Sequence, residues 1–518
     1  MKIKSYKTIG TLLLLVALLI PSIFSLLQPG FFESDDGEWM IIRFSSFYQS
    51  LSDGQFPVRF LGRLNYGFGY PVSNFLYPGF MYLAAPLKLM GLSFVSSIKL
   101  VLIISMVGGG FFTFKWLSKI FDEKSAFIGA VFYTYTPYHL YDLYKRGSVG
   151  EILSICLLPF ILWQLERQSV FFTAIGIFFL VLAHNTLAVL FLLFIVFYMG
   201  LNVYVSKKKK DLSLNYLITL LLGIGMASFF WLPAILELKY TVFSNTQVSE
   251  WQNYFANINL IGLSTFAVFL IIIILIFSKK ISIKKHRLTF LLLLIGMISV
   301  LLSNSISFRV WNIFPSSFVQ FPFRFLSLVL PSIAFLAASI VSVFSGRRKT
   351  VLSVVLVIAV FFSSLDFSFP KVTFDKGDSF YSTNEATTNV KDEYMPHWVK
   401  EKPIARFSEK VELSDGVQTR NQTYNSKKIY FEVSSEKEQV ARVNTIYYPG
   451  WIAKVNGREI EIDYGNRRGV IDLKLPSGAN RVELKFTETP LRLFSDLISL
   501  LSFLILLLWA RKDLGLRK

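Results

Sequence analysis

Long apolar runs recur along this chain, and short polar stretches separate them. About twelve of these runs approach the length that an α-helix needs to cross a hydrocarbon core of about 30 Å. They lie at approximately 9–29, 97–117, 125–141, 150–165, 169–184, 186–205, 213–235, 258–278, 288–304, 324–345, 350–368 and 491–510. The pattern predicts a mainly α-helical, polytopic membrane protein with about 12 transmembrane helices.

Composition and charge support this prediction. Of the 518 residues, 53% are hydrophobic and only 17% are charged, whereas a soluble protein of this length would need more polar surface to cover itself. The net charge is +19, but the basic residues gather in short clusters between apolar runs. These clusters are Lys207–Lys210, Lys279–Arg287, Arg347–Lys349 and Arg511–Lys518. This is the positive-inside pattern, so we expect a multi-pass protein of the cell membrane with both termini in the cytoplasm and no nucleic-acid partner.

Residues 30–96 do not read as ordinary spans. Residues 73–92 are apolar enough to cross the bilayer, but a crossing there would place the later basic clusters outside. An interfacial or re-entrant position is therefore favoured, although a span is not excluded by the pattern alone. Residues 39–51 carry one apolar stripe, with Arg43 and three polar residues largely off it, which is typical of an interfacial helix. We therefore expect a large first external loop at 30–96, within a membrane domain at 1–368.

The composition changes after about residue 369. Residues 369–490 are polar, and apolar and polar residues alternate in 429–433 and 481–486, as expected for strands. Asn456-Gly457 between two such runs is a strong type I′ hairpin signal. We expect an extracytoplasmic, β-sandwich-like domain at 369–490, followed by a final transmembrane helix and basic cytoplasmic tail at 491–518.

An acidic cluster stands where the first apolar run should emerge from the bilayer. Asp35, Asp36 and Glu38 follow that run directly, and carboxylates at this depth are costly unless they face water, a cation or a substrate. A carboxylate there could take a proton from an acceptor hydroxyl. The simpler alternative is a solvated charge cluster at a helix start, favoured by the helix dipole.

Isolated basic and polar residues fall in the loops on the same predicted side. If the substrate is a sugar carried on a lipid phosphate, arginines would stabilise the charge that develops on the phosphate as it leaves. The candidates for substrate and phosphate binding are Arg43, Arg59, Arg63, Arg146, Glu151, His184 and Arg324, with Asp36 and Asp35 as catalytic candidates. The alternatives are an ordinary Arg146–Glu151 ion pair, a polar turn at His184 and a snorkelling Arg324. One cysteine and four scattered histidines predict no metal site, and a divalent cation is left open as a cofactor.

Several stretches resemble a known family. Residues 35–78 resemble the first loop of a bacterial and archaeal membrane family that carries the label "pyruvoyl-tetrahydropterin synthase-related" and looks GT-C-like. Residues 138–147 with Glu151, residues 230–233 with Glu237, and residues 320–325 fit the same family. Residues 447–451, with the Asn456-Gly457 pair, resemble the external domain of YfhO-type membrane proteins, which are similar glycosyltransferase candidates.

The resemblance implies a GT-C architecture with a catalytic acid near the start of the first loop. It implies inverting transfer from a polyprenyl-phosphate sugar, and it places the acid on Asp36, with Asp35 beside it. Relatives often read His-Asp at this pair and carry another histidine a turn later, where this chain has Asp35 and Met40. The departure weakens any histidine-dependent role and leaves the aspartate intact. The pterin chemistry in the label would need a histidine-bound zinc, for which this chain has too few suitable histidines.

The leading hypothesis is a membrane glycosyltransferase that moves a sugar from a polyprenyl-phosphate donor to a glycan, lipid or protein acceptor at the outer face. The alternative is a non-catalytic lipid-linked glycan carrier, flippase or cell-envelope assembly protein on the same scaffold. An ion-coupled transporter would need ionisable residues at mid-span, and the predicted spans show few. The external domain would bind the acceptor, shape access to the site, or only cap the helices.

Overall fold

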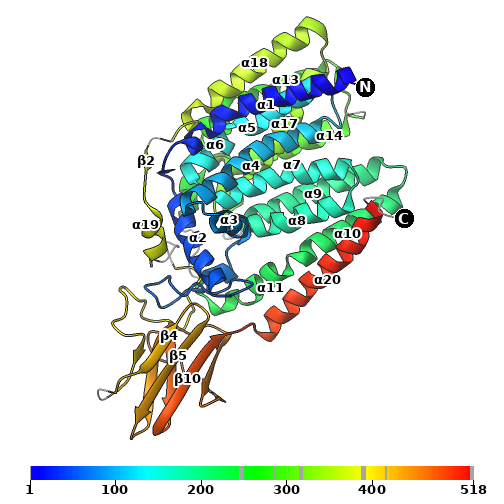
Figure 1. Cartoon of the computed structure of the whole chain (residues 1–518). Helices are drawn as coiled ribbons and strands as arrows, with labels where there is room; N and C mark the ends of the chain where they lie inside the picture. The colour runs from blue at the N-terminus through cyan, green and yellow to red at the C-terminus, as the bar shows by residue number, and fades with distance from the viewer. Residues whose placement is uncertain are drawn as a thin grey trace.

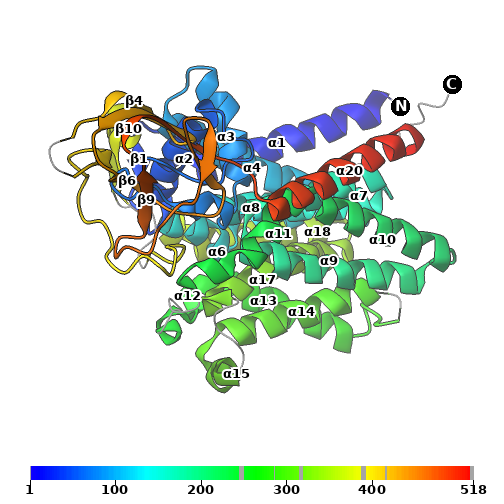
Figure 2. The ribbon, with the colours of Figure 1, turned by 90° about the horizontal axis from the view of Figure 1, so that it is seen from below.

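The computed structural model describes residues 2–243, 250–284, 286–313, 319–370, 372–386, 392–414 and 417–513. Its helices stack side by side in one large bundle, and its strands gather beyond one end of that bundle (Figure 1). The start of the first helix and the end of the last both lie at the opposite end, as the view from below also shows (Figure 2).

The first half of the chain is helical apart from one two-residue strand. Its elements are α1 (Lys2–Leu27), β1 (Phe31–Phe32), α2 (Gly37–Ser52), η1 (Pro71–Asn74), α3 (Gly79–Leu89), α4 (Phe94–Leu117), α5 (Glu123–Tyr135), α6 (Pro137–Tyr141), the π turn η2 (Asp142–Arg146), α7 (Val149–Glu166), α8 (Val170–Ala183), α9 (Asn185–Val205), α10 (Lys209–Met226), α11 (Ser228–Leu236) and η3 (Leu238–Tyr240).

The second half completes the bundle before the strands begin. Its helical elements are η5 (Trp251–Tyr254), α12 (Ile258–Ile261), α13 (Leu263–Phe277), α14 (Arg287–Ser303), η6 (Ser305–Ser307), α15 (Phe308–Ile313), η7 (Pro322–Phe325), α17 (Leu326–Ser342), α18 (Gly346–Ser364), η8 (Leu365–Phe367), α19 (Asp378–Thr383) and α20 (Pro490–Asp513). Its strands are β2 (Thr373–Phe374), β3 (Val411–Glu412), β4 (Arg420–Tyr424), β5 (Lys428–Ser435), β6 (Gln439–Ile446), β7 (Trp451–Val455), β8 (Arg458–Ile460), β9 (Val470–Leu475) and β10 (Gly478–Phe486).

Several helices have the length and composition of membrane spans. Within the described ranges, six are long and apolar enough to cross a membrane, or up to eight if each of two sharply bent pairs counts as one span. The six are Phe94–Leu117, Val149–Glu166, Asn185–Val205, Pro322–Ser342, Gly346–Phe367 and Pro490–Ala510. Three shorter apolar helices lie at Leu13–Leu27, Val170–Ala183 and Leu263–Phe277. The protein is therefore a multi-pass membrane protein by these criteria, and the expected number of 12 spans stays a prediction.

Two expected spans are broken in the structure. The run at 125–141 divides because Thr136, directly before Pro137, is extended rather than helical; a residue that precedes proline disfavours the helical region. The run at 213–235 bends by 69° between α10 and α11, and α14 bends by 78° into the segment Ser305–Ile313. The hydrophobic pattern located these helices but gave no sign of their direction.

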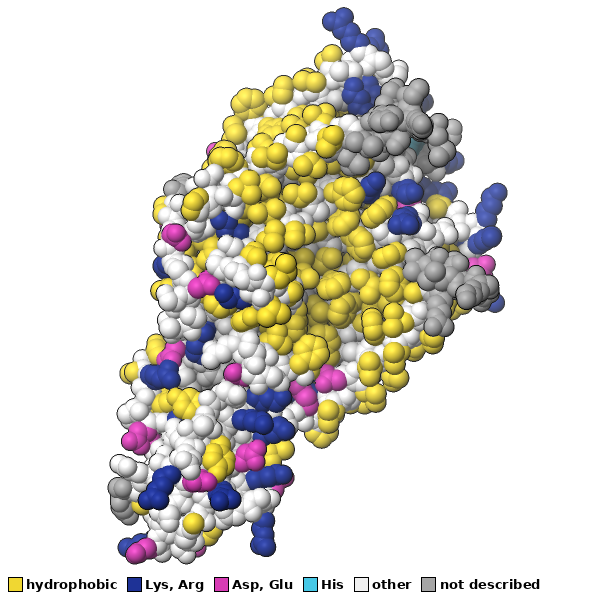
Figure 3. Space-filling model, in the orientation of Figure 1, with side chains coloured by type: hydrophobic (Ala, Val, Ile, Leu, Met, Phe, Trp, Pro, Cys, Tyr) yellow, Lys and Arg dark blue, Asp and Glu magenta, His cyan; other side chains and the backbone are white. Residues whose placement is uncertain are grey.

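The outer surface of the bundle is a broad apolar band. Hydrophobic side chains cover the visible face of the helices, whereas charged side chains collect at the two ends (Figure 3). On α20, Leu497, Leu500 and Leu504 are each about half exposed, as are Val354 and Ile358 on α18. An exposed apolar area of this extent fits a surface that faces lipid.

Small residues allow the central helices to approach closely. A side-chain carbon added to Gly129 of α5 would lie 2.6 Å from the carbonyl oxygen of Ala334 in α17. One added to Gly110 of α4 would lie 2.9 Å from Leu19 of α1. Small residues at helix crossings are typical of membrane bundles, where packing replaces the hydrophobic drive between helices.

The segment 30–96, the expected first loop, is more deeply buried than its sequence suggested. Arg43, Ser46 and Ser50 of α2 are each no more than 2% exposed, so polar residues beside the apolar stripe of this helix are buried as well. The helix is covered on a second side because α19 packs against it and β2 pairs with β1. The segment 73–92 contains α3, whose 11 residues are too few to span a bilayer.

Apart from the β1–β2 pair, the described strands form two antiparallel sheets beyond the end of the bundle. One has the order β4-β5-β10-β7-β8 and the other the order β3-β6-β9. Alternate residues of β5 are buried, and Asn456 and Gly457 both have positive φ at the β7–β8 turn. The predicted hairpin is therefore present and the C-terminal region is β-rich, while a sandwich arrangement of the two sheets stays a prediction.

Candidate functional site

The acidic cluster of the first loop is attached to the turn between α6 and α7. Asp36 is the N-cap residue of α2. The backbone amides of Asp35 and Asp36 donate to the carbonyl oxygens of Lys145 and Arg146, at 3.0 and 2.8 Å. This contact requires Gly147, which has φ 66°. A side-chain carbon there would lie 2.3 Å from the hydroxyl oxygen of Ser34.

Asp36 forms an ion pair with Arg146 at the edge of the site. Arg146 Nη2 lies 2.9 Å from Asp36 Oδ2, with the side chain of Asp36 35% exposed and that of Arg146 8% exposed. Burial alone would lower the pKa of Arg146, but Asp36, Glu151 and Asp142 raise it above its ordinary value. Arg146 therefore stays charged, and one face of the Asp36 carboxylate is open to solvent.

The other two acidic residues of the cluster are placed differently. Asp35 lies 3.9 Å from both Arg146 and Lys145, and partial burial raises its pKa against the opposing charge of Arg146. Glu38 pairs with Lys376 and so connects the start of α2 to the segment between β2 and α19. Of the three carboxylates, Asp36 has the closest contact with a nearly buried arginine.

A second acid–base cluster lies deeper. Glu151, in the first turn of α7, is fully buried. Its Oε1 accepts from Arg324 Nε at 3.0 Å and lies 2.9 Å from Arg324 Nη2. His184 Nε2 lies 3.5 Å from Glu151 Oε1, and the Tyr138 hydroxyl donates to Oε2 at 3.2 Å. Pairing and hydrogen bonding of this kind are what a buried carboxylate requires.

Aromatic rings lie between the Asp36–Arg146 pair and the deeper Glu151–Arg324 pair. The guanidinium of Arg146 lies over the rings of Phe321 and Phe323, at 5.1 and 5.5 Å from their centroids. That of Arg324 lies 4.9 Å from the centroid of Phe321. Both arginines therefore contact the Phe321 ring. The ring face attracts each guanidinium by a cation–π interaction and orients its plane.

Arg43 and Tyr77 complete the side of the site formed by the first loop. Arg43 is 2% exposed, and burial lowers its pKa, while Tyr77 and Asp36 oppose that change. The ring of Tyr77 lies 4.5 Å from that of His184. Burial raises the pKa of Tyr77, which interacts electrostatically with Arg43, Asp36, Glu151 and Arg324. Tyr77 thus lies among groups from both clusters.

The structure brings most of the predicted site residues into one region. These are Asp35, Asp36, Arg43, Arg146, Glu151, His184 and Arg324. Arg59 lies elsewhere: it pairs with Glu488 at 3.3 Å and with Asp496 at 3.2 Å. Arg63 donates to the carbonyl oxygens of Ser382 and Tyr381 and to the hydroxyl of Ser45. Both follow α2 in the chain: Arg59 takes no part in the described contacts around Asp36, and Arg63 lies against the middle of α2 through Ser45.

Asp142 was not among the predicted site residues. It is fully buried in the π turn, and burial together with the nearby Glu151 carboxylate raises its pKa well above the ordinary value. Arg146 and Arg324 oppose this rise. Its position four residues before Arg146 was a usable signal, because that spacing places two side chains on one face of a helical turn.

The site shows no preformed metal centre. Within the described ranges, no group of three or more histidine, cysteine, aspartate and glutamate side chains could hold a metal ion. The chemistry that the arrangement allows is proton transfer at an accessible carboxylate beside two arginines that can bind an anion.

The fold and the site define a multi-pass membrane protein with a β-rich C-terminal region and an acid–base cluster at one end of its bundle. A family model described as "6-pyruvoyl-tetrahydropterin synthase related domain; membrane protein" matches residues 75–370, more than half of the chain. The chain belongs to this family of membrane proteins, as its sequence resemblance predicted.

Two solved structures of other proteins match part of this chain at low identity. Arabinofuranosyltransferase AftD from Mycobacteria is 14% identical with a TM-score of 0.45, and the match covers 70% of this chain and 27% of that one. Oligosaccharyltransferase AglB from Archaeoglobus fulgidus is 12% identical with a TM-score of 0.42, and the match covers 74% of this chain and 57% of that one. No curated protein matches this chain. Similarities this distant do not assign an activity.

Proposed function

We propose that this protein is an integral membrane glycosyltransferase of the GT-C type. It transfers a sugar from a polyprenyl-phosphate donor to a glycan, lipid or protein acceptor. The observation that carries the proposal is the partly exposed Asp36 carboxylate, 2.9 Å from Arg146, in front of the buried Glu151–Arg324 pair. An accessible base beside two ordered cations is what such a transfer needs.

In the proposed reaction Asp36 is the general base. It accepts the proton of the acceptor hydroxyl as that oxygen attacks the anomeric carbon of the donor sugar. The bond from the anomeric carbon to the phosphate oxygen breaks, and its electron pair leaves with the polyprenyl phosphate. Attack from the side opposite the leaving group inverts the anomeric configuration.

The arginines would stabilise the leaving phosphate. Phosphate oxygens would compete with Asp36 for the guanidinium of Arg146, so donor binding would loosen the ion pair and free the carboxylate to act as a base. Glu151 accepts two donors of Arg324 and acts as its positioning residue. His184 and Asp142 contribute to the charge balance behind it.

The proposed orientation places both termini in the cytoplasm and the site outside it. The start of α1 and the end of α20 lie at one end of the bundle, opposite the strands (Figure 1, Figure 2). The basic cluster Lys207–Lys210 connects α9 to α10, and Arg347–Lys349 begins α18. We propose a membrane domain at 1–368, an extracytoplasmic domain at 369–490 and a final helix with a cytoplasmic tail at 491–518.

The test replaces each acid of the cluster in the producing cells. Asp36→Asn keeps the shape and the hydrogen-bonding oxygen but removes the base, so we expect the glycan product to disappear from the cell surface, as read by mass spectrometry. Asp35→Asn should reduce it less. Glu38→Gln is the matched control, because Glu38 lies on the same helix start and pairs with Lys376 instead.

A glycan profile unchanged by Asp36→Asn in normally expressed protein would contradict the proposal. It would favour the alternative, a lipid-linked glycan carrier, flippase or assembly protein, because none of these needs a proton acceptor at this position. Loss of the product in Asp36→Asn with retention in Glu38→Gln would exclude a general effect of charge at this helix start.

A further inference from the structure

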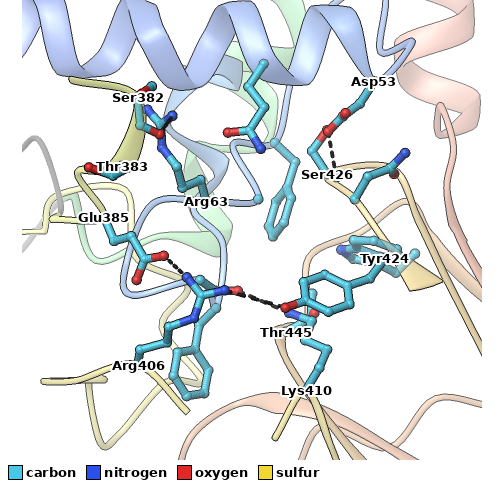
Figure 4. Close-up of a pocket in the computed structure, with 17 residues that line it drawn as sticks. Asp53, Arg63, Ser382, Thr383, Glu385, Arg406, Lys410, Tyr424, Ser426 and Thr445 are labelled. Carbon is cyan, nitrogen blue, oxygen red and sulfur yellow. Dashed lines mark hydrogen bonds and ion pairs between the residues drawn. The ribbon is translucent and has the colours of Figure 1, made fainter. Parts of the chain in front are cut away.

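A hollow lies toward the end of α2 that is far from Asp36. A cavity of about 500 Å³ opens between the first loop and the β-rich region (Figure 4). Its wall residues fall in three segments, 49–68, 382–385 and 406–451. Gln49 lies thirteen positions after Asp36 along α2, which is about 20 Å at 1.5 Å per residue. The cavity is therefore separate from the site around Asp36.

The walls of this cavity are held by hydrogen bonds between the loop and the strands. Gln55 Nε2 donates to the carbonyl oxygens of Phe60 and Ser426, at 2.8 and 3.0 Å. The Ser426 amide donates to Asp53 Oδ2 at 2.9 Å. A side-chain carbon added to Gly62 would lie 2.8 Å from Ser426 Cα, so a glycine is needed for this approach. The hollow is preformed, as ligand sites usually are.

The lining combines ring faces with many polar groups. Tyr424, Trp451 and Phe68 supply aromatic surface, and hydroxyl and amide groups come from residues such as Thr383 and Asn425. Figure 4 shows Arg406 between Glu385 and Tyr424, with which it forms an ion pair and a hydrogen bond. Apolar faces next to closely spaced donors and acceptors match the two kinds of surface that a sugar ring presents.

Polar atoms at the wall have unused bonding capacity. Thr445 Oγ1, Trp451 Nε1 and Arg63 Nε are buried and have no hydrogen-bond partner among the described residues. Thr445 is 3% exposed and Trp451 is 4% exposed. Buried polar groups in folded proteins are nearly always satisfied, so each such group needs an explanation. A bound polar ligand, reached by a small side-chain adjustment, would provide the missing partners.

We propose that this cavity binds a saccharide, as a remote segment of an extended acceptor glycan. The choice of a saccharide rests on the proposed glycosyl transfer, whereas the position and the chemistry of the cavity do not. Among its charged lining residues, Asp53 and Glu385 already have partners within the protein. Of the basic lining residues, Arg406 is the partner of Glu385 and burial lowers the pKa of Lys410, so the cavity suits a neutral or a weakly acidic sugar chain.

The test measures binding by the full-length protein in lipid nanodiscs. The probe is the pool of saccharides released by mild acid from the surface of the producing cells and labelled at the reducing end. Tyr424→Ala removes a ring from an exposed position of β4, and Thr383→Trp narrows the cavity from the end of α19. We expect each to weaken binding by about tenfold or more, read by fluorescence anisotropy.

Tyr430→Ala is the matched control. Tyr424 pairs with Ile429 in the sheet, so the next residue, Tyr430, points to the opposite face, away from the cavity lining. We expect this variant to bind as the wild type does. No binding by the wild-type protein, or equal binding by all three variants and the wild type, would overturn the proposal.

Asp36→Asn separates this proposal from the proposed function. We expect it to bind the saccharide pool with unchanged affinity while making no product. If Asp36→Asn left the surface glycan intact but Tyr424→Ala still lost binding, the glycosyltransferase assignment would fail and the saccharide site would stand. If Asp36→Asn lost the product and no variant altered binding, the saccharide site would fail and the glycosyltransferase assignment would stand.

Discussion

Arg324 and Glu151 show at the scale of single residues how a charge is kept inside this protein. Glu151 is fully buried and receives two donors from Arg324. Removing one partner of a buried pair leaves the other charge uncompensated. The pair therefore fixes the relative position of the two side chains behind the proposed active site and keeps both of them charged.

Arg324→Gln should therefore destabilise the protein strongly. The expected loss is about 3–5 kcal/mol of unfolding free energy, because the Glu151 carboxylate would remain buried without its cation. The double variant Arg324→Gln with Glu151→Gln should recover part of this loss, measured by thermal unfolding in detergent. Equal destabilisation in the single and the double variant would contradict the role of the pair.

Lys410 gives a pH-dependent prediction in the β-rich region. Burial lowers its pKa to about 7 from 10.5, so between these values the unfolded chain carries a proton on this amine that the folded chain does not. Stability should therefore rise with pH across this interval and fall as pH decreases toward 7, because stability increases with pH wherever the unfolded state binds more protons.

The check is a comparison of melting temperatures from pH 7 to pH 10 in the wild type and in Lys410→Met. The contribution of this group, at most about 1.4 kcal/mol per pH unit, should be missing from the variant. A variant whose melting temperature follows the same pH dependence as the wild type would exclude Lys410 as the source.

At the scale of elements, the site depends on the contact between the start of α2 and the turn before α7. Gly147→Ala should disturb this contact in two ways, by backbone strain at φ 66° and by the collision with Ser34. Strain of this kind costs about 1–3 kcal/mol. We expect loss of the surface glycan product together with a lower melting temperature.

Gly346→Ala is the control for strain alone. Gly346 has φ 56°, and nothing lies within 4 Å of an added side-chain carbon. The variant should lose stability through its backbone and keep the product. A similar loss of product in both variants would mean that the contact between the two segments is unimportant.

Sequence reasoning predicted the helices better than their geometry. Each expected apolar run contains a helix, because lipid-facing segments must be apolar along their length. The breaks at Thr136 and at Ala227 were missed, although Pro137 marks the first; the second has no proline beside it. For the site, Asp36 and Arg146 were named as candidates, but the pairing of Glu151 with Arg324 was not predictable. These residues are 173 positions apart, and only packing brings them together.

At the scale of the whole molecule, one buried network joins the bundle, the first loop and the strands. Glu237, after α11, accepts from Arg492 of α20 at 2.8 Å and from the Tyr448 hydroxyl, before β7, at 2.8 Å. Asn74 of η1 donates to the same carboxylate at 2.7 Å. Four distant segments therefore depend on one carboxylate for their relative position.

Arg492→Leu should weaken this junction. The Glu237 carboxylate would lose its cation, and we expect about 3–5 kcal/mol of destabilisation together with faster proteolysis between the strands and the bundle. Arg467→Leu is the matched control, because Arg467 and Glu401 form an exposed pair with side chains 80% and 50% exposed, worth about 0–1 kcal/mol. Equal proteolysis of the two variants would argue against a junction at Glu237.

The sequence by itself determined the membrane class, the positions of the helices, the β-rich end and the acidic cluster at the first loop. These follow from local composition and periodicity, which act over a few residues to about twenty. Only the tertiary structure decided which charges meet. It joined Asp36 to Arg146 and Glu151 to Arg324, and it placed Arg59 and Arg63 apart from them. The physical reason is that a buried ion pair depends on helix direction and packing, which local sequence does not encode.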